Sequence, residues 1–176
     1  KYPLVSHQLD SFREFLRTYI PNIIKSNNPI SMIKTENDKI IFRIDIEIGH
    51  NNEIYVDRPT ILEKDKDVLL TPNEARLRNL TYQTNIYADV KFKFYDRTNF
   101  SEPVKFENEN DTLFKKMYIG FVPIMLHSDA CILHGNNKDV ISELKECRYD
   151  YGGYFIIDGK EKVIISQERI TKNRLF

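Results

Sequence analysis

Apolar and polar residues alternate along two stretches of this chain, which is the pattern of β-strands with one buried face. In residues 40–48 every second position is Ile or Phe, and a shift of one residue would bury Arg43, Asp45 and Glu47. The alternation over residues 82–95 is longer, with apolar or small side chains mostly at even positions and polar ones mostly at odd positions. Both stretches are predicted to be strands with a well-specified register.

Other segments have the spacing of helices. An amphipathic stripe with steps of three and four residues is formed by Leu9, Phe12, Leu16, Tyr19 and Ile23. Pro21 is expected to end or kink this helix near Ile20, because proline cannot donate the helical hydrogen bond.

Two short helices are predicted from capping residues. Thr71, Pro72 and Glu74 suit the N-cap, first and third positions of a helix. Asp139 suits the N-cap of a second helix that carries Val140, Ile141 and Leu144.

A β-hairpin is predicted around Asp158-Gly159. β-Branched and aromatic runs flank this pair, and Asp-Gly is favoured in two-residue loops whose central positions need positive φ. Residues 96–103 and 108–111 are rich in turn-forming side chains and are predicted to be loops.

The mixed order of strands and helices predicts an α+β fold with a mixed, mainly antiparallel sheet and a few flanking helices. A length of 176 residues fits one domain, so residues 1–176 are expected to form a single domain. No apolar run approaches the ~20 residues of a membrane span, and we expect no membrane partner. The chain opens without Met or a secretory signal and ends without a helix cap, so we expect a piece of a longer polypeptide.

Charge is unevenly distributed, although 26 basic and 26 acidic side chains cancel overall. Residues 36–67 hold nine acidic and five basic side chains, whereas residues 160–176 hold five basic and two acidic ones. The chain as a whole lacks the basic character of an autonomous nucleic-acid binder. A phosphate-facing surface is therefore expected toward the C-terminal end, and the alternative is a solvated face.

Four residues of zinc-ligand type lie within 21 positions: His127, Cys131, His134 and Cys147. Closed zinc sites pair their ligands through tight knuckles, and Cys147 has no such partner nearby. Cys131 is explained more simply as a small buried hydrophobe. We expect no metal here, and a small zinc enzyme is the alternative. Two unpaired cysteines suit a reducing intracellular compartment.

Motifs for acyl or phosphoryl transfer are absent from the sequence, which holds no G-x-S-x-G elbow, P-loop or G-x-G-x-x-G. The pair Gly152-Gly153 is too short to cradle a phosphate. It is expected to lead into a strand past a tight turn, with close backbone approach. We therefore expect no catalytic residue in this chain.

Four segments, in order along the chain, resemble one protein family. GGYFIIDGKEKVIISQE at 152–168 closely resembles the signature of the second-largest subunit of multisubunit DNA-dependent RNA polymerases, with a weaker echo in the bacterial β subunit. EARLRNLTY at 74–82 resembles an upstream element of the same subunit, and further similarities lie at 119–126 and 7–12. The region resembles the N-terminal protrusion of eukaryotic or large-DNA-virus polymerases. Residues 27–67 and 96–117 resemble nothing recognisable.

This resemblance implies a protrusion-like fold that forms a wall of the DNA cleft. It places the catalytic Mg²⁺ in the largest subunit and the Zn²⁺ site near the far C-terminus of this one, so this chain needs no cofactor of its own. Nucleotide transfer then belongs to the DNA-directed RNA polymerase assembly, and the isolated chain is expected to be inactive. Implied partners are other polymerase subunits, DNA and initiation factors, in the nucleus, or in the cytoplasm or virion for a viral enzyme.

The residues themselves suggest where nucleic acid would bind. Exposed cations at the C-terminal end are the candidates for phosphate contact: Lys160, Lys162, Arg169, Lys172 and Arg174. Residues 169–176 are expected to form a basic arm that leads toward the following lobe domain. A free-standing nucleic-acid- or protein-binding module of the same fold is the alternative function.

Other side chains compete for that role. Arg76 and Arg78 are rival phosphate contacts, but at least one is expected to form an internal ion pair. Tyr151, Tyr154 and Phe155 have the ring type that stacks on bases, and core packing is favoured for Phe155.

Overall fold

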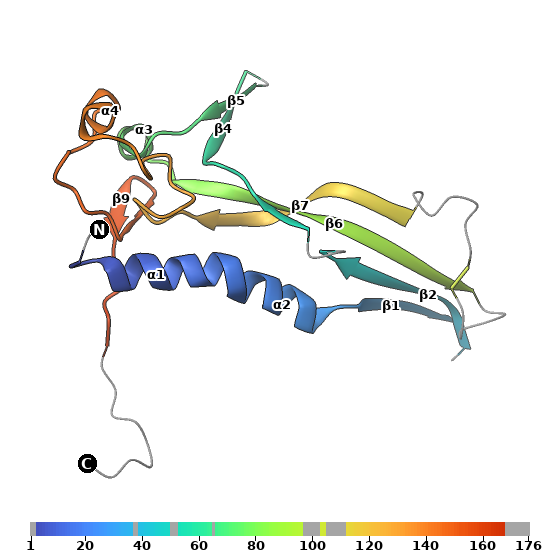
Figure 1. Ribbon diagram of the computed structural model, residues 1–176. Coiled ribbons are helices and arrows are strands. Elements are labelled where there is room, and N and C mark those ends of the chain that lie inside the picture. The colour runs from blue at the N-terminus through green and yellow to red at the C-terminus, as the bar shows by residue number, and fades with distance from the viewer. Residues whose placement is uncertain are drawn as a thin grey trace, which may run out of the picture.

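The computed structural model describes residues 3–36, 39–49, 53–64, 66–96, 103–104 and 112–167. Within these ranges the chain combines helices with antiparallel sheets, which confirms the predicted α+β class (Figure 1). The predicted loop at 108–111 lies outside the described residues.

A five-stranded antiparallel sheet forms the body of the molecule (Figure 1). Its strands are β1 (Ile30–Glu36), β2 (Lys39–Ile48), β3 (Ile54–Val56), β6 (Gln83–Asp96) and β7 (Leu113–Pro123). The central strand is β6, which pairs with β2 and β3 along one edge and with β7 along the other, while β1 pairs with β2. Two small hairpins stand apart from this sheet: β4 (Thr60–Glu63) with β5 (Lys66–Leu69), and β8 (Phe155–Ile157) with β9 (Lys160–Lys162).

The alternation along β6 is confirmed. Every even position from Tyr82 to Val90 is buried, whereas Gln83, Asn85 and Tyr87 stay partly exposed. Asp89 departs from the pattern because its carboxylate is buried and accepts a hydrogen bond from the Lys116 backbone N–H at 2.9 Å. One face of this part of the sheet is therefore covered and the other open.

The N-terminal helix runs past the point where Pro21 was expected to end it. Helices α1 (Ser6–Glu14) and α2 (Ile20–Asn27) are joined by a π-helical segment, Phe15–Tyr19, in which the Ile20 N–H donates to the Phe15 carbonyl. Pro21 occupies the first turn of α2, where its missing N–H breaks no necessary bond. Of the two predicted outcomes, an end of the helix near Ile20 is wrong. The regular α-helical bonding is nevertheless interrupted directly before Ile20, by the π turn.

The apolar stripe of this helix is buried only in its first half. Leu9 and Phe12 belong to the core, whereas Tyr19 and Ile23 are exposed. In Figure 1 the helix lies along one half of the sheet and leads into β1, so the far half of the sheet lies beyond its reach.

Strand β2 forms as predicted, but its burial does not follow the pattern. Ile40 and Phe42, on the face expected to be covered, are exposed, while Asp45 on the other face is buried. The Asp45 carboxylate is tolerated because Arg43 and the Ser31 hydroxyl both donate hydrogen bonds to it, at 2.8 and 2.6 Å. These bonds hold the pKa of Asp45 below its usual value although burial opposes them.

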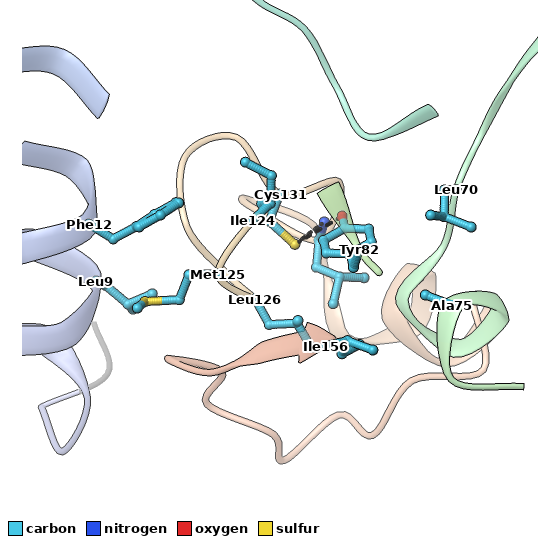
Figure 2. Packing of buried hydrophobic residues seen from close by; sticks show 11 residues of the cluster. Leu9, Phe12, Leu70, Ala75, Tyr82, Ile124, Met125, Leu126, Cys131 and Ile156 are labelled. Atoms are coloured by element: carbon cyan, nitrogen blue, oxygen red, sulfur yellow. Dashed lines mark hydrogen bonds between the residues drawn. The ribbon is translucent and has the colours of Figure 1, made fainter. Parts of the chain in front are cut away.

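The hydrophobic core lies at one end of the sheet, where four segments meet (Figure 2). Figure 2 shows Leu9 and Phe12 of α1 facing Met125 in the loop after β7, with Tyr82 and Ile156 on the side away from α1. The Tyr82 hydroxyl accepts the Ile132 N–H at 3.2 Å and lies 3.4 Å from the Cys131 sulfur. The fully or nearly fully buried side chains of this core include Tyr82, Ile124, Leu126, Leu133 and Ile156.

The capping predictions differ in outcome. Helix α3 (Pro72–Leu77) begins as expected, with the Thr71 hydroxyl accepting the Glu74 N–H at 3.2 Å. Helix α4 (Lys138–Glu143) has Asn137 as its N-cap, so the assignment of Asp139 is wrong by two residues. Asp139 lies in the first turn instead, where an acidic side chain also favours the helix dipole.

Candidate nucleic-acid interface

The β8–β9 hairpin has the predicted turn. Asp158 and Gly159 both have positive φ, 50° and 73°, as a two-residue loop of this kind requires. The strands are shorter than the sequence indicates, because β9 ends at Lys162 and the apolar run Val163–Ile165 is exposed. The turn geometry fixes where Lys160 begins the second strand.

The hairpin is bonded to the chain segment that follows α3. The Gly159 N–H donates to the Leu80 carbonyl at 3.0 Å, and the Tyr82 N–H donates to the Ile156 carbonyl at 2.9 Å. The Asp158 N–H donates to the Thr81 hydroxyl at 3.2 Å. The two sequence motifs, 74–82 and 152–168, therefore meet in one structural unit across their described residues.

The Gly152-Gly153 pair is confirmed as a place of close backbone approach. Both residues have positive φ, and a Cβ added to Gly152 would lie 2.8 Å from Cδ2 of His127. The Gly153 N–H donates to the Leu126 carbonyl at 3.1 Å, which ties the entry of β8 to the core loop.

Arg76 is the centre of a partly buried polar network. Its guanidinium donates to both carboxylate oxygens of Glu146 at 2.9 Å, to Glu161 at 2.8 Å and to the Tyr154 hydroxyl at 2.8 Å. Burial raises the pKa of Glu146, and the hydrogen bonds from Arg76 oppose that effect. Burial and the hydrogen bond to Asp150 raise the pKa of Tyr154. This network joins α3, the segment after α4 and the hairpin.

Arg76 and Arg78 are both engaged in internal ion pairs. Arg78 donates to Glu63 and, at 2.9 Å, to Glu74. The expectation of an internal ion pair is thus confirmed for both arginines. The sequence offered no local signal for Glu146, because its partner lies 70 residues away.

Lys160 and Lys162 are exposed on one face of the hairpin. They pair with Ile157 and Phe155 across the two strands, whereas Glu161 points to the other face and binds Arg76. The described residues place no carboxylate within ion-pairing distance of either lysine. Both side chains are therefore open to an outside anion. The remaining candidates, Arg169, Lys172 and Arg174, lie outside the described residues.

The aromatic candidates divide between packing and exposure. Phe155 packs edge-on against Phe12, with ring centroids 5.5 Å apart, which confirms the predicted core role. Tyr154 is held in the Arg76 network. Tyr151 is exposed to about half of its surface.

The four residues of zinc-ligand type do not form a site. Cys131 is buried beside Tyr82, Cys147 is exposed, and the His134 ring contacts the His127 carbonyl at 3.3 Å. In the described part of the chain, no group of three or more potential ligands could hold a metal ion. Burial lowers the pKa of His127.

Comparison with known proteins identifies the family of this chain. A family model described as "RNA polymerase beta subunit" matches residues 3–172. None of the described helices is long and apolar enough to cross a membrane.

Curated relatives match nearly the whole chain. DNA-directed RNA polymerase II subunit RPB2 of Eremothecium gossypii is 38% identical over 97% of this chain, which covers 15% of that relative. DNA-directed RNA polymerase II subunit 2 of Arabidopsis thaliana is 38% identical over 98% of the chain and 15% of its own length. DNA-directed RNA polymerase subunit Rpo2N of Methanothermobacter thermautotrophicus is 33% identical over 100% of the chain and 30% of its own length. The chain therefore belongs to the RNA polymerase beta subunit family and corresponds to the N-terminal region of the second-largest subunit.

Proposed function

We propose that this chain is a non-catalytic wall of the DNA cleft in a DNA-directed RNA polymerase, and that Lys160 and Lys162 meet DNA phosphates. The observation that carries the proposal is the fixed hairpin, whose turn bonds to Leu80 and Thr81 and which presents both lysines outward without an acidic partner among the described residues. Phosphate contacts of this kind position a duplex without reading its sequence. Arg169, Lys172 and Arg174 extend the proposed contact.

The nucleotide-transfer chemistry is assigned to other parts of the assembly. The chain covers about 15% of its eukaryotic relatives, and its sequence holds no phosphate-binding loop. The catalytic Mg²⁺ and the Zn²⁺ of the parent enzyme are placed elsewhere in this proposal. We expect the isolated 176-residue chain to leave an RNA primer unextended on a DNA template. Template-directed extension by a preparation free of host polymerase would contradict this assignment.

Partners and location follow from the same proposal. The chain would contact other polymerase subunits and DNA and would offer surfaces to initiation factors. Its relatives include subunits of polymerases II and III, so the nucleus is the proposed site of action, or the cytoplasm or virion for a viral enzyme.

The DNA contact is tested by salt dependence in the intact polymerase. Changing Lys160, Lys162 and Arg169 together to Gln is expected to flatten the slope of log affinity against log salt by about three units at most, because DNA binding releases fewer counterions when phosphate contacts are lost. Base preference should stay the same. Open-complex stability at several salt concentrations gives the slope.

A matched triple variant controls for total charge. Lys25, Lys66 and Lys138 are exposed cations on other elements, and changing them to Gln is expected to leave the slope nearly unchanged. Equal slopes for the two triple variants would show that the hairpin lysines are a solvated or factor-binding face.

A further inference from the structure

The open face of the five-stranded sheet carries a row of aromatic rings. Tyr55 of β3 pairs with Tyr87 of β6, which pairs in turn with Tyr118 of β7. Phe121 pairs with Asn85 on the same face. Buried side chains such as Ile86 and Ala88 point to the opposite face, so the aromatic row lies on the side that the described residues leave partly exposed.

Two of these rings are unusually exposed. Tyr118 is 55% and Phe121 59% exposed. Both belong to β7, and a register shift between them places them on the same face although they are three positions apart. The Tyr118 ring meets Tyr87 edge-on, with centroids 6.0 Å apart and an interplanar angle of 67°, so the two rings are not stacked face to face. Exposed apolar groups gathered on one face are the kind of surface at which binding sites are found.

Two lysines with no ion-paired carboxylate among the described residues lie on the same face as the rings. Lys116 places its ammonium 5.2 Å from the Tyr55 ring centroid, and Lys91 lies on the same face of β6. Among the described residues no carboxylate lies within ion-pairing distance of Lys91 or Lys116.

Acidic groups on this face are already engaged. Glu47 pairs with Lys93 at 3.4 Å, Asp45 with Arg43 at 2.8 Å, and Glu53 accepts the Tyr55 hydroxyl at 3.0 Å. Asp89, between Tyr87 and Lys91 on β6, is buried and accepts the Lys116 backbone N–H at 2.9 Å. Two cations therefore stay available beside a row of exposed rings.

We propose that this open face binds single-stranded nucleic acid, with Tyr118 and Phe121 stacking on bases and Lys91 and Lys116 meeting phosphates. Aromatic rings on a sheet, flanked by cations, are the chemistry that binds single strands without sequence preference. This goes beyond the proposed duplex contact of the hairpin, because it uses different residues on a different element.

The spacing of the rings selects single strands over duplex. Tyr118 and Phe121 stand opposite Tyr87 and Asn85, which are two residues and so about 7 Å apart along β6. Successive bases of a duplex strand are only about 3.4 Å apart along the axis. Neighbouring bases can reach both rings only when the strand is extended and its bases are unstacked.

Direct binding tests the proposal. Fluorescein-labelled oligo(dT) of 12 nucleotides should bind the 176-residue chain more tightly than a 12-base-pair duplex, measured by anisotropy at 50 mM salt. The double variant Tyr118→Ala with Phe121→Ala is expected to weaken oligo(dT) binding at least about tenfold. The variant Tyr118→Phe should bind as the parent does, because it keeps the ring and loses only the hydroxyl.

Control variants separate this face from the rest of the strand. Phe114 is 50% exposed on β7, but it pairs with Val90 and so lies on the opposite face. Phe114→Ala should leave oligo(dT) binding unchanged. Changing Lys91 and Lys116 together to Gln should flatten the salt slope by about 1.4 units.

Three results would overturn the proposal: equal affinity for single strand and duplex, unchanged binding by the Tyr118 and Phe121 double variant, or an equal loss with Phe114→Ala. Unfolding midpoints of all variants show whether a loss reflects damage to the fold. A negative result for the open face would not contradict the proposed phosphate contacts of the hairpin lysines, because those contacts are tested with duplex DNA in the intact polymerase.

Discussion

Replacing Arg76 with Met is expected to lower the free energy of unfolding by about 3–5 kcal/mol. The Glu146 side chain is only 5% exposed, and Arg76 supplies the hydrogen bonds to both of its oxygens. Without the guanidinium, a buried carboxylate is left uncompensated, and Glu161 and Tyr154 lose the partner that they share. Urea unfolding of the parent and the variant at pH 7 measures the change.

A surface arginine provides the matched control. Arg17 also pairs with a carboxylate, that of Asp129, but its side chain is 69% exposed, so Arg17→Met should cost about 1 kcal/mol or less. The double variant Arg76→Met with Glu146→Leu should recover part of the stability, because the unpaired charge is gone. An equal loss of unfolding free energy for Arg76→Met and Arg17→Met would show that the buried network contributes no more to stability than an exposed ion pair.

The cost of Arg76→Met should also depend on pH. Burial raises the folded-state pKa of Glu146, and removing Arg76 raises it further, because Arg76 is the main group that opposes the shift. A carboxyl with a raised pKa stabilises the fold below its unfolded pKa of about 4.3 and loses that contribution as pH rises through the folded pKa. The difference between variant and parent should therefore be smaller near pH 4 than at pH 7.

Local rules predicted the elements whose causes are local. The turn at Asp158-Gly159 and the cap at Thr71 depend on residues within three positions of each other, and both are present. The alternation along β6 also predicted which face is covered, because β6 is a paired strand and its buried side chains recur at every second residue, as the apolar residues do in the sequence.

Local rules could not predict features that depend on residues far apart in the sequence. The burial of Asp45 is tolerated because Ser31, on the neighbouring strand, donates to it. The Ile40 side of β2 is exposed because no helix among the described residues reaches that half of the sheet. In the candidate interface, the sequence identified Lys160 and Lys162 as cations. It did not reveal that Glu161 between them turns to Arg76 and leaves the two lysines on one open face.

Replacing Gly159 with Ala is expected to lower the free energy of unfolding by about 2–5 kcal/mol. Two effects add: a left-handed backbone with φ of 73° costs an alanine about 1–2 kcal/mol, and crowding costs about 1–3 kcal/mol. The added Cβ would lie 2.7 Å from Oδ1 of Asn79, 2.8 Å from its Cα and 3.0 Å from the Arg76 carbonyl oxygen. Because two of these atoms are backbone, the hairpin itself must move away from α3.

Gly135 separates the two effects. Its φ of 74° is nearly the same, but an added Cβ meets nothing within 4 Å, so Gly135→Ala should carry only the backbone cost of about 1–2 kcal/mol. The difference between the two variants, measured by urea unfolding, is then the crowding between the turn and α3. If that difference is about zero, the hairpin is not seated on α3 as described. If it is about 1–3 kcal/mol, the contact that fixes the direction of Lys160 and Lys162 is tight, and the same variant should also weaken their effect on open-complex stability.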